Sequence, residues 1–245
     1  MEFQGKVALV TGGTRGIGAA IVRLFAERGA DVAFTYARSD EAARDLVGEL
    51  GASGVKVLAI KADSRDLAAV RAAVAQTARE LGRVDILVNS AGVFPAGPVG
   101  DATLDEISDT LAIHAGAVFA ASQAALPHMG SGGRIISIGS CFAQRVPYGG
   151  VTLYAMSKSA LIGFTKGLAR DLGPRGITVN VVHPGATDTD MNPAVGEHAD
   201  AQLARMAIPH FGKPEDIAGL IAYLASEEGR FITGAGLTID GGVNS

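Results

Sequence analysis

The chain has 245 residues, 48% of them apolar, and a formal net charge of −4. That length suits one or two domains, and the apolar share is enough for a large core. The slightly acidic balance provides no basic surface for nucleic acid, and no run of about 18 apolar residues predicts a membrane span. The single cysteine, Cys141, cannot form a disulfide within the chain, which is compatible with a reducing compartment. Because no signal-peptide pattern opens the chain, we expect a cytoplasmic protein without nucleic-acid or membrane partners.

The first expected element is a short apolar strand, KVALVT at 6–11, which runs into a glycine-rich turn at 12–18. A helical pattern follows and ends near Gly29. Glycines let the backbone approach a ligand closely, and a helix N-terminus offers free N–H groups and the positive end of its dipole. Strand, turn and helix in this order predict a cradle for phosphate groups. The spacing, Gly-x-x-x-Gly-x-Gly, differs from the usual Gly-x-Gly-x-x-Gly fingerprint.

Further along, short β-branched or apolar runs alternate with helical patterns. The strand-like runs are DVAFTY, VKVLAIKA, VDILVNS, RIISIGS, ITVNVV and GLTID. The helical stretches lie near 16–29, 40–50, 65–81, 103–129, 153–172 and 214–226. This alternation predicts an α/β fold, a doubly wound parallel sheet with helices on both faces, whose ligand lies beyond the carboxyl ends of the strands. No linker or repeat interrupts the pattern, so residues 1–245 are expected to form a single domain.

Tyr154 and Lys158 lie four residues apart in a helical pattern and therefore project from the same face of the helix. A nearby ammonium stabilises a phenolate and so lowers the pKa of the phenol. A phenol with such a pKa is suited to exchange a proton with an alcohol or a carbonyl. The same pair is common on solvated helix faces, so its meaning depends on the other motifs of the chain.

Six motifs occur together in one order. They are Thr11-Gly12-x-x-x-Gly16-x-Gly18, Asp63, Asn89-Ser90-Ala91-Gly92, Ser140, Tyr154-x-x-x-Lys158 and Pro184-Gly185. With them the chain resembles the short-chain dehydrogenase/reductase family from about Lys6 to Gly242. It is similar to the single-domain, beta-ketoacyl-ACP reductase-like members. The resemblance implies a Rossmann-like NAD(P)-binding domain over 1–245, with a substrate lid around 190–212.

The resemblance also implies which residues bind the cofactor. They are Gly12, Thr14, Arg15, Gly16, Ile17, Gly18, Tyr36, Ala37, Arg38, Ser39, Asp63, Ser64, Asn89, Ser90, Ala91, Gly92, Tyr154, Lys158, Pro184, Gly185, Thr187 and Thr189. The second strand is expected to end near Tyr36, where NAD-preferring enzymes carry an acid that binds the ribose 2′-hydroxyl. No acid occurs there before Asp40, whereas Arg38, Ser39 and Arg15 could bind a 2′-phosphate. We therefore predict NADPH rather than NADH; solvated surface arginines are the alternative.

Two of these positions allow a second interpretation. Asp63 matches the carboxylate of the family that contacts adenine, but it could also cap the following helix. Ser90 replaces the second Asn of the Asn-Asn-Ala-Gly motif of the family. The segment is still expected to line the cofactor, while Asn89 stabilises the sheet.

The resemblance implies roles for the catalytic residues. Ser140 positions the carbonyl oxygen, and Tyr154 donates the proton as general acid. Lys158 lowers the pKa of Tyr154 and binds the nicotinamide ribose. The expected reaction is reduction of a small-molecule ketone to a secondary alcohol with NADPH. No His, Cys or Asp cluster has the spacing of a metal site, so no metal is expected, and Cys141 is expected to be an unreactive loop residue.

His114 stands where the family usually has an Asn that helps to hold a proton-relaying water. An imidazole can donate and accept hydrogen bonds, so it could support the same relay as part of the catalytic set. The alternative is a satisfied core histidine that leaves the relay altered.

The lid and the loops around it carry apolar side chains, which predict a partly apolar pocket for a small or medium ketone. They are Met191, Met206, Ile208, Phe211, Phe94, Phe142 and Tyr148. The small apolar faces of the helices near 103–129 and 153–172 suit a homotetramer or a dimer, although helices that pack on a sheet would look the same. Two alternative functions remain open: alcohol oxidation with NAD(P)+, and a nucleotide-binding sensor with vestigial turnover.

Overall fold

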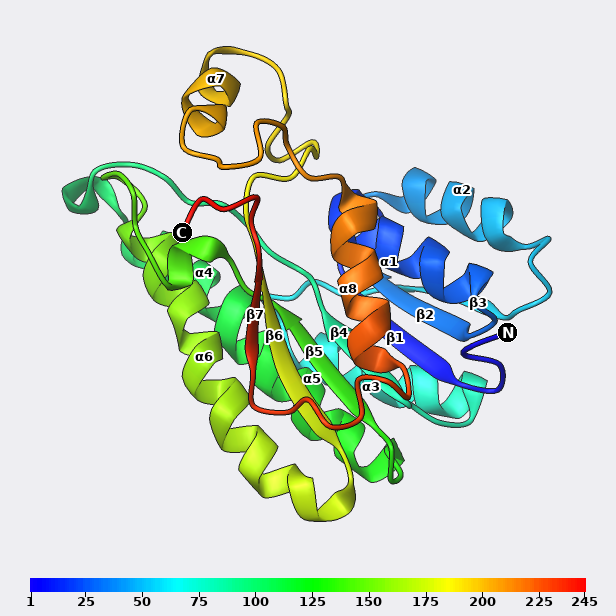
Figure 1. Ribbon diagram of the computed structural model, residues 1–245. Helices are drawn as coiled ribbons and strands as arrows, with labels where there is room; N and C mark the ends of the chain where they lie inside the picture. The colour runs from blue at the N-terminus through cyan, green and yellow to red at the C-terminus, as the bar shows by residue number, and fades with distance from the viewer.

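The computed structural model describes residues 1–245, with every side chain except that of Glu197. Seven parallel strands form one sheet in the order β3-β2-β1-β4-β5-β6-β7 (Figure 1). The strands are β1 (Val7–Thr11), β2 (Asp31–Tyr36), β3 (Val57–Lys61), β4 (Ile86–Asn89), β5 (Arg134–Ile138), β6 (Thr178–Pro184) and β7 (Gly236–Ile239). Every residue of β1, β4, β5 and β6 is buried. Central strands covered on both faces need such continuous apolar runs, and the predicted doubly wound sheet is confirmed.

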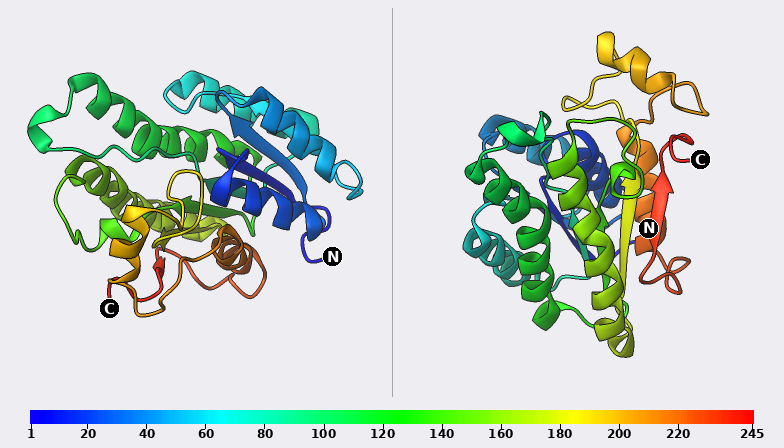
Figure 2. Two further views of the ribbon diagram at one scale, coloured as in Figure 1. Left: turned by 90° about the horizontal axis from the view of Figure 1, so that it is seen from above. Right: turned by 90° about the vertical axis from the view of Figure 1, so that its left-hand side faces the viewer.

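Helices cover both faces of the sheet (Figures 1 and 2). Successive residues of a strand point to opposite faces. Val10 accordingly belongs to one core with α1 (Gly16–Glu27), α2 (Asp40–Leu50) and α8 (Pro214–Ala225). Leu9 belongs to the other core with α3 (Leu67–Leu81), α5 (Ala117–Ala125) and the end of α6 (Thr152–Leu172).

The helix predicted over 103–129 is not continuous. It consists of α4 (Leu104–Leu111), a π-helical turn at Ala112–Gly116, α5 and a 3-10 turn at Leu126–His128. A π turn inserts one residue into a helix and is frequent at functional sites, and here it contains the buried His114. Apolar periodicity alone does not distinguish such a turn from an α-helix, which explains the error.

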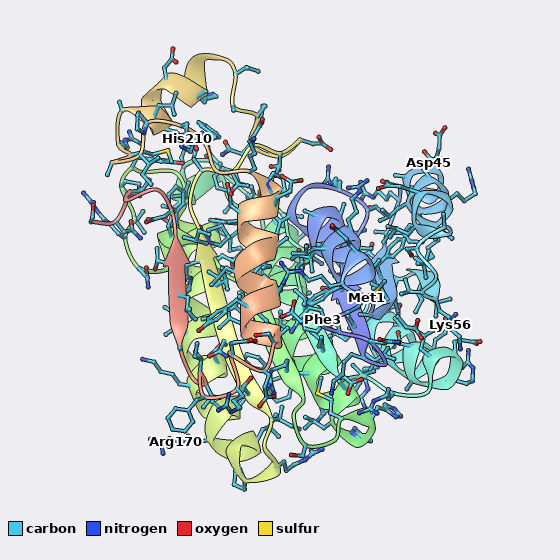
Figure 3. The ribbon with its side chains drawn as sticks, turned by 45° about the vertical axis from the view of Figure 1, so that its right-hand side comes forward. Met1, Phe3, Asp45, Lys56, Arg170 and His210 are labelled. Carbon is cyan, nitrogen blue, oxygen red and sulfur yellow. The ribbon has the colours of Figure 1, made fainter. Side chains whose placement is uncertain are left out.

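The segment 190–212 stands out from the body of the molecule at the carboxyl edge of the sheet (Figure 2). It contains one short helix that the sequence did not predict, α7 (Glu197–Leu203). A backbone bridge between Thr187 and Gly212 fixes its base. In Figure 3, His210 lies on the returning arm of this segment, while Met1 and Phe3 lie beside α1.

The strand order reverses between β1 and β4, because the chain leaves β1 towards β2 and returns on the other side of β1 as β4. Such a switch point is where open α/β sheets bind ligands. The glycine turn after β1 and the Ser90–Gly92 segment after β4 both lie there. Within the described part of the chain, no helix is both long and apolar enough to cross a membrane.

Candidate active site

A cleft of about 1610 Å³ runs along the carboxyl edge of the sheet. Its wall includes every site residue predicted from the sequence except Asn89 and His114. Asn89 is buried at the end of β4, and its amide nitrogen lies 3.5 Å from the Ser137 hydroxyl. His114 lies behind the wall and is 1% exposed. The other predicted residues thus come together in the wall of one cleft. Asn89 and His114 are buried behind that wall.

The glycine turn leaves no room for side chains. A Cβ added at Gly18 would lie 2.1 Å from the Gly12 carbonyl oxygen, and one at Gly12, where φ is +69°, would lie 2.8 Å from the Ala91 Cα. The turn therefore needs glycine both for backbone conformation and for close approach. It places the N-terminus of the 12-residue helix α1 against the cleft. A bare backbone facing a helix N-terminus fits the diphosphate of a dinucleotide.

Two threonines that the sequence did not assign to the site stabilise this geometry. The Thr35 hydroxyl accepts the Gly12 N–H at 3.1 Å, and the Thr11 hydroxyl accepts the N–H groups of Ser90 and Ala91 at 3.0 and 3.2 Å. Their hydrogen bonds connect β1, β2 and the segment after β4 at the switch point. Both threonines lie at or near the end of a strand, where such residues cap backbone groups that the sheet leaves unpaired. That position in the sequence could have revealed their role.

One end of the cleft, which we call the adenosine end, carries charged side chains that are largely exposed. Arg15 and Arg38 are exposed and line it. Arg65, which the sequence did not single out, contacts Asp63 at 2.6 Å and Asp109 at 3.2 Å, and its guanidinium holds the pKa of Asp63 below its usual range. The helix-cap interpretation of Asp63 is wrong, because the Asp66 carboxylate accepts the first N–H groups of α3.

Ser140, Tyr154 and Lys158 meet at the inner end of the cleft. Ser140 follows β5, is 6% exposed and accepts the Phe142 N–H on its hydroxyl at 3.2 Å. Tyr154 and Lys158 project from the first turns of α6. Lys158 is 5% exposed, and its ammonium donates to the Ile138 carbonyl at 2.9 Å and lies 5.9 Å from the centroid of the Tyr154 ring.

Burial dominates the protonation of this pair. It raises the pKa of Tyr154 to about 12, although the Ser140 hydroxyl beside the phenol opposes the rise. Burial also lowers the pKa of Lys158 to about 8. Lowering of the tyrosine pKa was predicted, but desolvation outweighs an ammonium 5.9 Å from the ring centroid and raises it. The phenol is therefore protonated at neutral pH.

His114 forms hydrogen bonds through both ring nitrogens. Its Nε2 accepts the Val93 N–H at 3.0 Å, and its Nδ1 lies 2.8 Å from the Ser157 hydroxyl, which itself donates to the Tyr154 carbonyl at 2.7 Å. The ring is therefore the neutral tautomer protonated at Nδ1. Burial and the nearby Lys158 charge lower the pKa of His114 to about 2. These contacts match the alternative of a satisfied core histidine.

Comparison with known proteins identifies the family. A family model described as enoyl-(acyl carrier protein) reductase matches residues 12–244. A short-chain dehydrogenase of Burkholderia cenocepacia, solved in complex with NADP, is 60% identical with a TM-score of 0.99, and the match covers 100% of both chains. The chain belongs to the short-chain dehydrogenase/reductase family. The predicted family and fold are confirmed, and the chain is an oxidoreductase of the class that acts on CH–OH or C=O groups with NAD(P).

Two curated relatives from Escherichia coli differ in their names. The 3-oxoacyl-(acyl-carrier-protein) reductase is 40% identical over 246 residues, which is 99% of each chain. A cyclic-di-GMP-binding biofilm dispersal mediator protein is 48% identical over 239 residues, which is 98% of this chain and 97% of the relative. The cofactor in the Burkholderia structure, NADP, is of the type predicted for this chain.

The substrate end of the cleft is only partly as expected. Phe94, Phe142, Tyr148 and Met191 line it. The predicted lining by Met206, Ile208 and Phe211 is wrong: they are not among the residues of the wall. The Ile208 N–H instead bonds to the Gly241 carbonyl at 2.9 Å, and the Met206 side chain packs at Gly241. The returning arm of the segment is thus tied to the C-terminal residues.

Two further expectations concern other reactive groups. Cys141 is 4% exposed, and burial raises the pKa of its thiol to about 11, so it is a thiol and not a thiolate at neutral pH. Among the residues that the structure describes, no group of three His, Cys, Asp or Glu side chains could hold a metal ion.

Proposed function

We propose that the protein reduces a ketone to a secondary alcohol with NADPH. The observation that carries the proposal is that Tyr154, Lys158 and the Ser140 hydroxyl meet at the inner end of a cleft that fits a dinucleotide. A proton donor is what reduction of a carbonyl requires, and the raised pKa of the half-buried Tyr154 phenol is that of a donor.

Each residue has one task in this reaction. NADPH, when bound, supplies the hydride. The Ser140 hydroxyl accepts the Phe142 N–H, so its own proton is available to the carbonyl oxygen of the substrate. Tyr154 then donates a proton to that oxygen as negative charge develops there, and both groups stabilise this charge in a dry site. Lys158 lies close enough to stabilise the phenolate that remains.

Arg38 and Arg15 are proposed to bind the 2′-phosphate. Both line the adenosine end, which offers no acid between the end of β2 at Tyr36 and Asp40. Asp40 itself is paired with Lys61 at 2.8 Å, so its charge is compensated. A phosphate with two arginines forms strong charge-assisted hydrogen bonds.

We infer that His114 positions the site and does not relay protons. It joins the Val93 backbone, on the loop after β4, to Ser157 and hence to the Tyr154 carbonyl on α6. Its low pKa supports a ring that stays neutral through the working pH range. We expect His114→Asn to retain turnover, because an amide can supply an acceptor and a donor. Complete loss of turnover in a folded, NADPH-binding variant would contradict this.

The substrate is proposed to be apolar and flat enough to lie among aromatic rings, with the segment 190–212 as its lid. Phe94 and Phe142 stand edge-on to the Tyr154 ring, with centroids at 4.7 and 6.2 Å, and Tyr148 stands edge-on to Phe142 at 5.4 Å. Two rings from the loops after β4 and β5 thus stand against the reacting phenol, and Tyr148 extends this aromatic wall from the loop after β5. Aryl and alkyl ketones fit this wall better than strongly hydrated sugars do.

A cytoplasmic homotetramer or dimer is the proposed assembly. Phe119 on α5 is 58% exposed, Met156 on α6 is 50% exposed, and the Phe119 ring lies 6.0 Å from that of Phe164. An exposed apolar face across two neighbouring helices suits contact with a second copy. Light scattering on the purified protein measures the assembly directly.

The experiment that tests the proposed function is NADPH consumption with a panel of ketones, diketones and beta-ketoacyl thioesters, with Tyr154→Phe in parallel. We expect turnover by the wild type and a fall of about 10²–10⁴-fold in kcat for the variant, with NADPH binding unchanged. Tyr223→Phe, a tyrosine of α8 outside the cleft lining, is the matched control. Turnover that survives in Tyr154→Phe would overturn the proposal.

One observation favours a second function. The relative named for binding cyclic-di-GMP is more similar to this chain than the reductase is, so binding of that dinucleotide is the alternative. Cyclic-di-GMP displacing NADPH from folded protein that turns over no ketone would favour this sensor function. Turnover unaffected by cyclic-di-GMP would favour the reductase.

A further inference from the structure

His183 lies directly behind the catalytic serine and has no part in the reaction described so far. It belongs to β6 and is fully buried, at 0% exposure. Its Nδ1 atom lies 3.3 Å from the Ser140 amide nitrogen and 3.0 Å from the Ser140 carbonyl oxygen. One ring nitrogen of His183 therefore contacts the backbone of Ser140, which is 43 positions away in the sequence. Ser140 presents its hydroxyl to the cleft.

The neutral His183 ring can bond the Ser140 backbone in either of its two tautomers. Burial lowers the pKa of His183, so the ring is neutral and carries one N–H. The Ser140 carbonyl already accepts the Ala143 N–H at 3.0 Å. Among the described residues, the Ser140 N–H has only His183 Nδ1 as an acceptor.

The two neutral tautomers differ in which Ser140 backbone group they bond. With the proton on Nδ1, the ring donates to the Ser140 carbonyl at 3.0 Å. With the proton on Nε2, Nδ1 accepts the Ser140 N–H at 3.3 Å. In either tautomer Nδ1 bonds the Ser140 backbone, while Nε2 has no partner among the described residues.

Two glycines hold the imidazole in place. A Cβ added at Gly139 would lie 2.5 Å from Nδ1, and one at Gly236 would lie 3.0 Å from Nε2. Gly139 directly follows β5 and Gly236 begins β7. The His183 ring, on β6, therefore packs between the two neighbouring strands β5 and β7. This close packing fixes the direction in which Nδ1 points.

We propose that His183 is a positioning residue for Ser140. By bonding the Ser140 backbone through Nδ1 it fixes the start of the 3-10 turn Cys141–Ala143. The hydroxyl of Ser140 is thereby held towards the carbonyl oxygen of the substrate. The inference rests on the proposed carbonyl reduction and adds a residue that acts through the catalytic serine.

Two variants at position 183 separate the hydrogen bond from the volume of the ring. In His183→Asn the side-chain amide falls close to the place of Nδ1 and can bond the Ser140 backbone through its oxygen or its nitrogen. In His183→Leu no hydrogen-bonding group remains. We expect His183→Leu to lose about 10–100-fold in kcat, since a small misplacement of a catalytic group has effects of that size, with the Kd for NADPH unchanged. His183→Asn should keep most of the activity, and His128→Leu, at an exposed histidine, should behave as the wild type.

A double-mutant cycle with Ser140→Ala distinguishes positioning from a general structural role. If His183 acts through the serine hydroxyl, His183→Leu has little further effect on kcat once that hydroxyl is gone. An equal loss in both backgrounds, or wild-type kcat in a folded His183→Leu protein, overturns the proposal.

A test without turnover uses 15N NMR of histidine-labelled, ligand-free protein, with His183→Asn to assign the signal. We expect His183 as a single neutral tautomer, because the Ser140 backbone holds its Nδ1, and His114 as the Nδ1–H tautomer. A doubly protonated His183, or one that exchanges between both tautomers, overturns the proposal even if His183→Leu fails to fold. The proposed function fails on a separate result, the absence of Tyr154-dependent turnover.

Discussion

The two ends of the cleft differ in how far their charged and titratable groups are exposed to solvent. At the adenosine end, Arg15 and Arg38 are exposed, and Arg65 is paired with Asp63 in water. At the catalytic end, Lys158 is 5% exposed and His114 is 1% exposed. Charges at the first end face solvent and are screened by salt. Groups at the second end have pKa values moved by desolvation. We therefore expect cofactor choice to depend on the first end and proton transfer to depend on the second.

The largest expected effect that separates the two ends comes from Arg38→Gln. Loss of a charge-assisted hydrogen bond to the 2′-phosphate should cost about 1.5–3 kcal/mol, so KM for NADPH should rise about 10–100-fold. KM for NADH and kcat at saturation should not change. Steady-state kinetics with both cofactors at two salt concentrations measure this.

Arg71→Gln is the control for that variant, because Arg71 is exposed on α3 and bonds to Gln123 outside the cleft. An equal rise in KM for NADPH and NADH would show that Arg38 contacts something other than the 2′-phosphate. A fall in kcat would show that the two ends are coupled.

The next effect is the pH dependence of the catalytic end. The pKa of Lys158 is about 8, so its charge, which stabilises the phenolate formed in reduction, is lost as pH rises through about 8. The pKa of Tyr154, about 12, keeps the phenol protonated over the same range. We expect kcat for reduction to fall about tenfold per pH unit above pH 8.

No acid limb from His114 is expected near pH 6.5, because the pKa of its buried ring is about 2. A pH profile of kcat between 5 and 10 in a mixed buffer measures both features. Loss of rate as pH falls through 6.5, absent in His114→Asn, would instead show that His114 titrates and relays protons.

A difference between local patterns and contacts across strands explains how much of the site could be predicted from the sequence. The glycine turn and the Tyr154–Lys158 pair are local patterns, so their place in the cleft followed from strand and helix order. The His183–Ser140 contact joins β6 to the loop after β5 and has no local signature, because it depends on strand register.

Two elements were not predicted, for different reasons. Helix α7 has only seven residues, too few for a clear apolar period. The π turn at His114 keeps a helical apolar pattern and so looks like an α-helix in the sequence. The lining of the lid was misjudged because an apolar residue in a loop can face a cleft or a neighbouring loop equally well. Met206 packs at Gly241 near the C-terminus instead of facing the substrate.

The smallest expected effect is on stability and concerns Lys158→Met. Burial lowers the pKa of Lys158 from 10.5 to about 8, so keeping the charge in the folded protein costs roughly 3 kcal/mol at neutral pH. Methionine removes this cost but leaves the Ile138 carbonyl, the acceptor of Lys158, unpaired at about 1–3 kcal/mol. We expect a net gain of about 1 kcal/mol, which raises Tm by about 2–4 °C, while reduction is lost.

The sign of the pH dependence provides a sharper test of Lys158→Met than Tm at one pH. The cost is fully present below pH 8, where Lys158 is charged in both states. Between pH 8 and 10.5 the folded lysine is neutral while the unfolded one still binds a proton, so the stability of the wild type rises with pH relative to the variant. The advantage of Lys158→Met in Tm over the ligand-free wild type should therefore shrink and then reverse over that window. Lys166→Met, at an exposed lysine of the same helix, should show no such trend. A difference independent of pH would mean that the buried lysine is hydrated, and that the catalytic end is not the desolvated site that distinguishes it from the adenosine end.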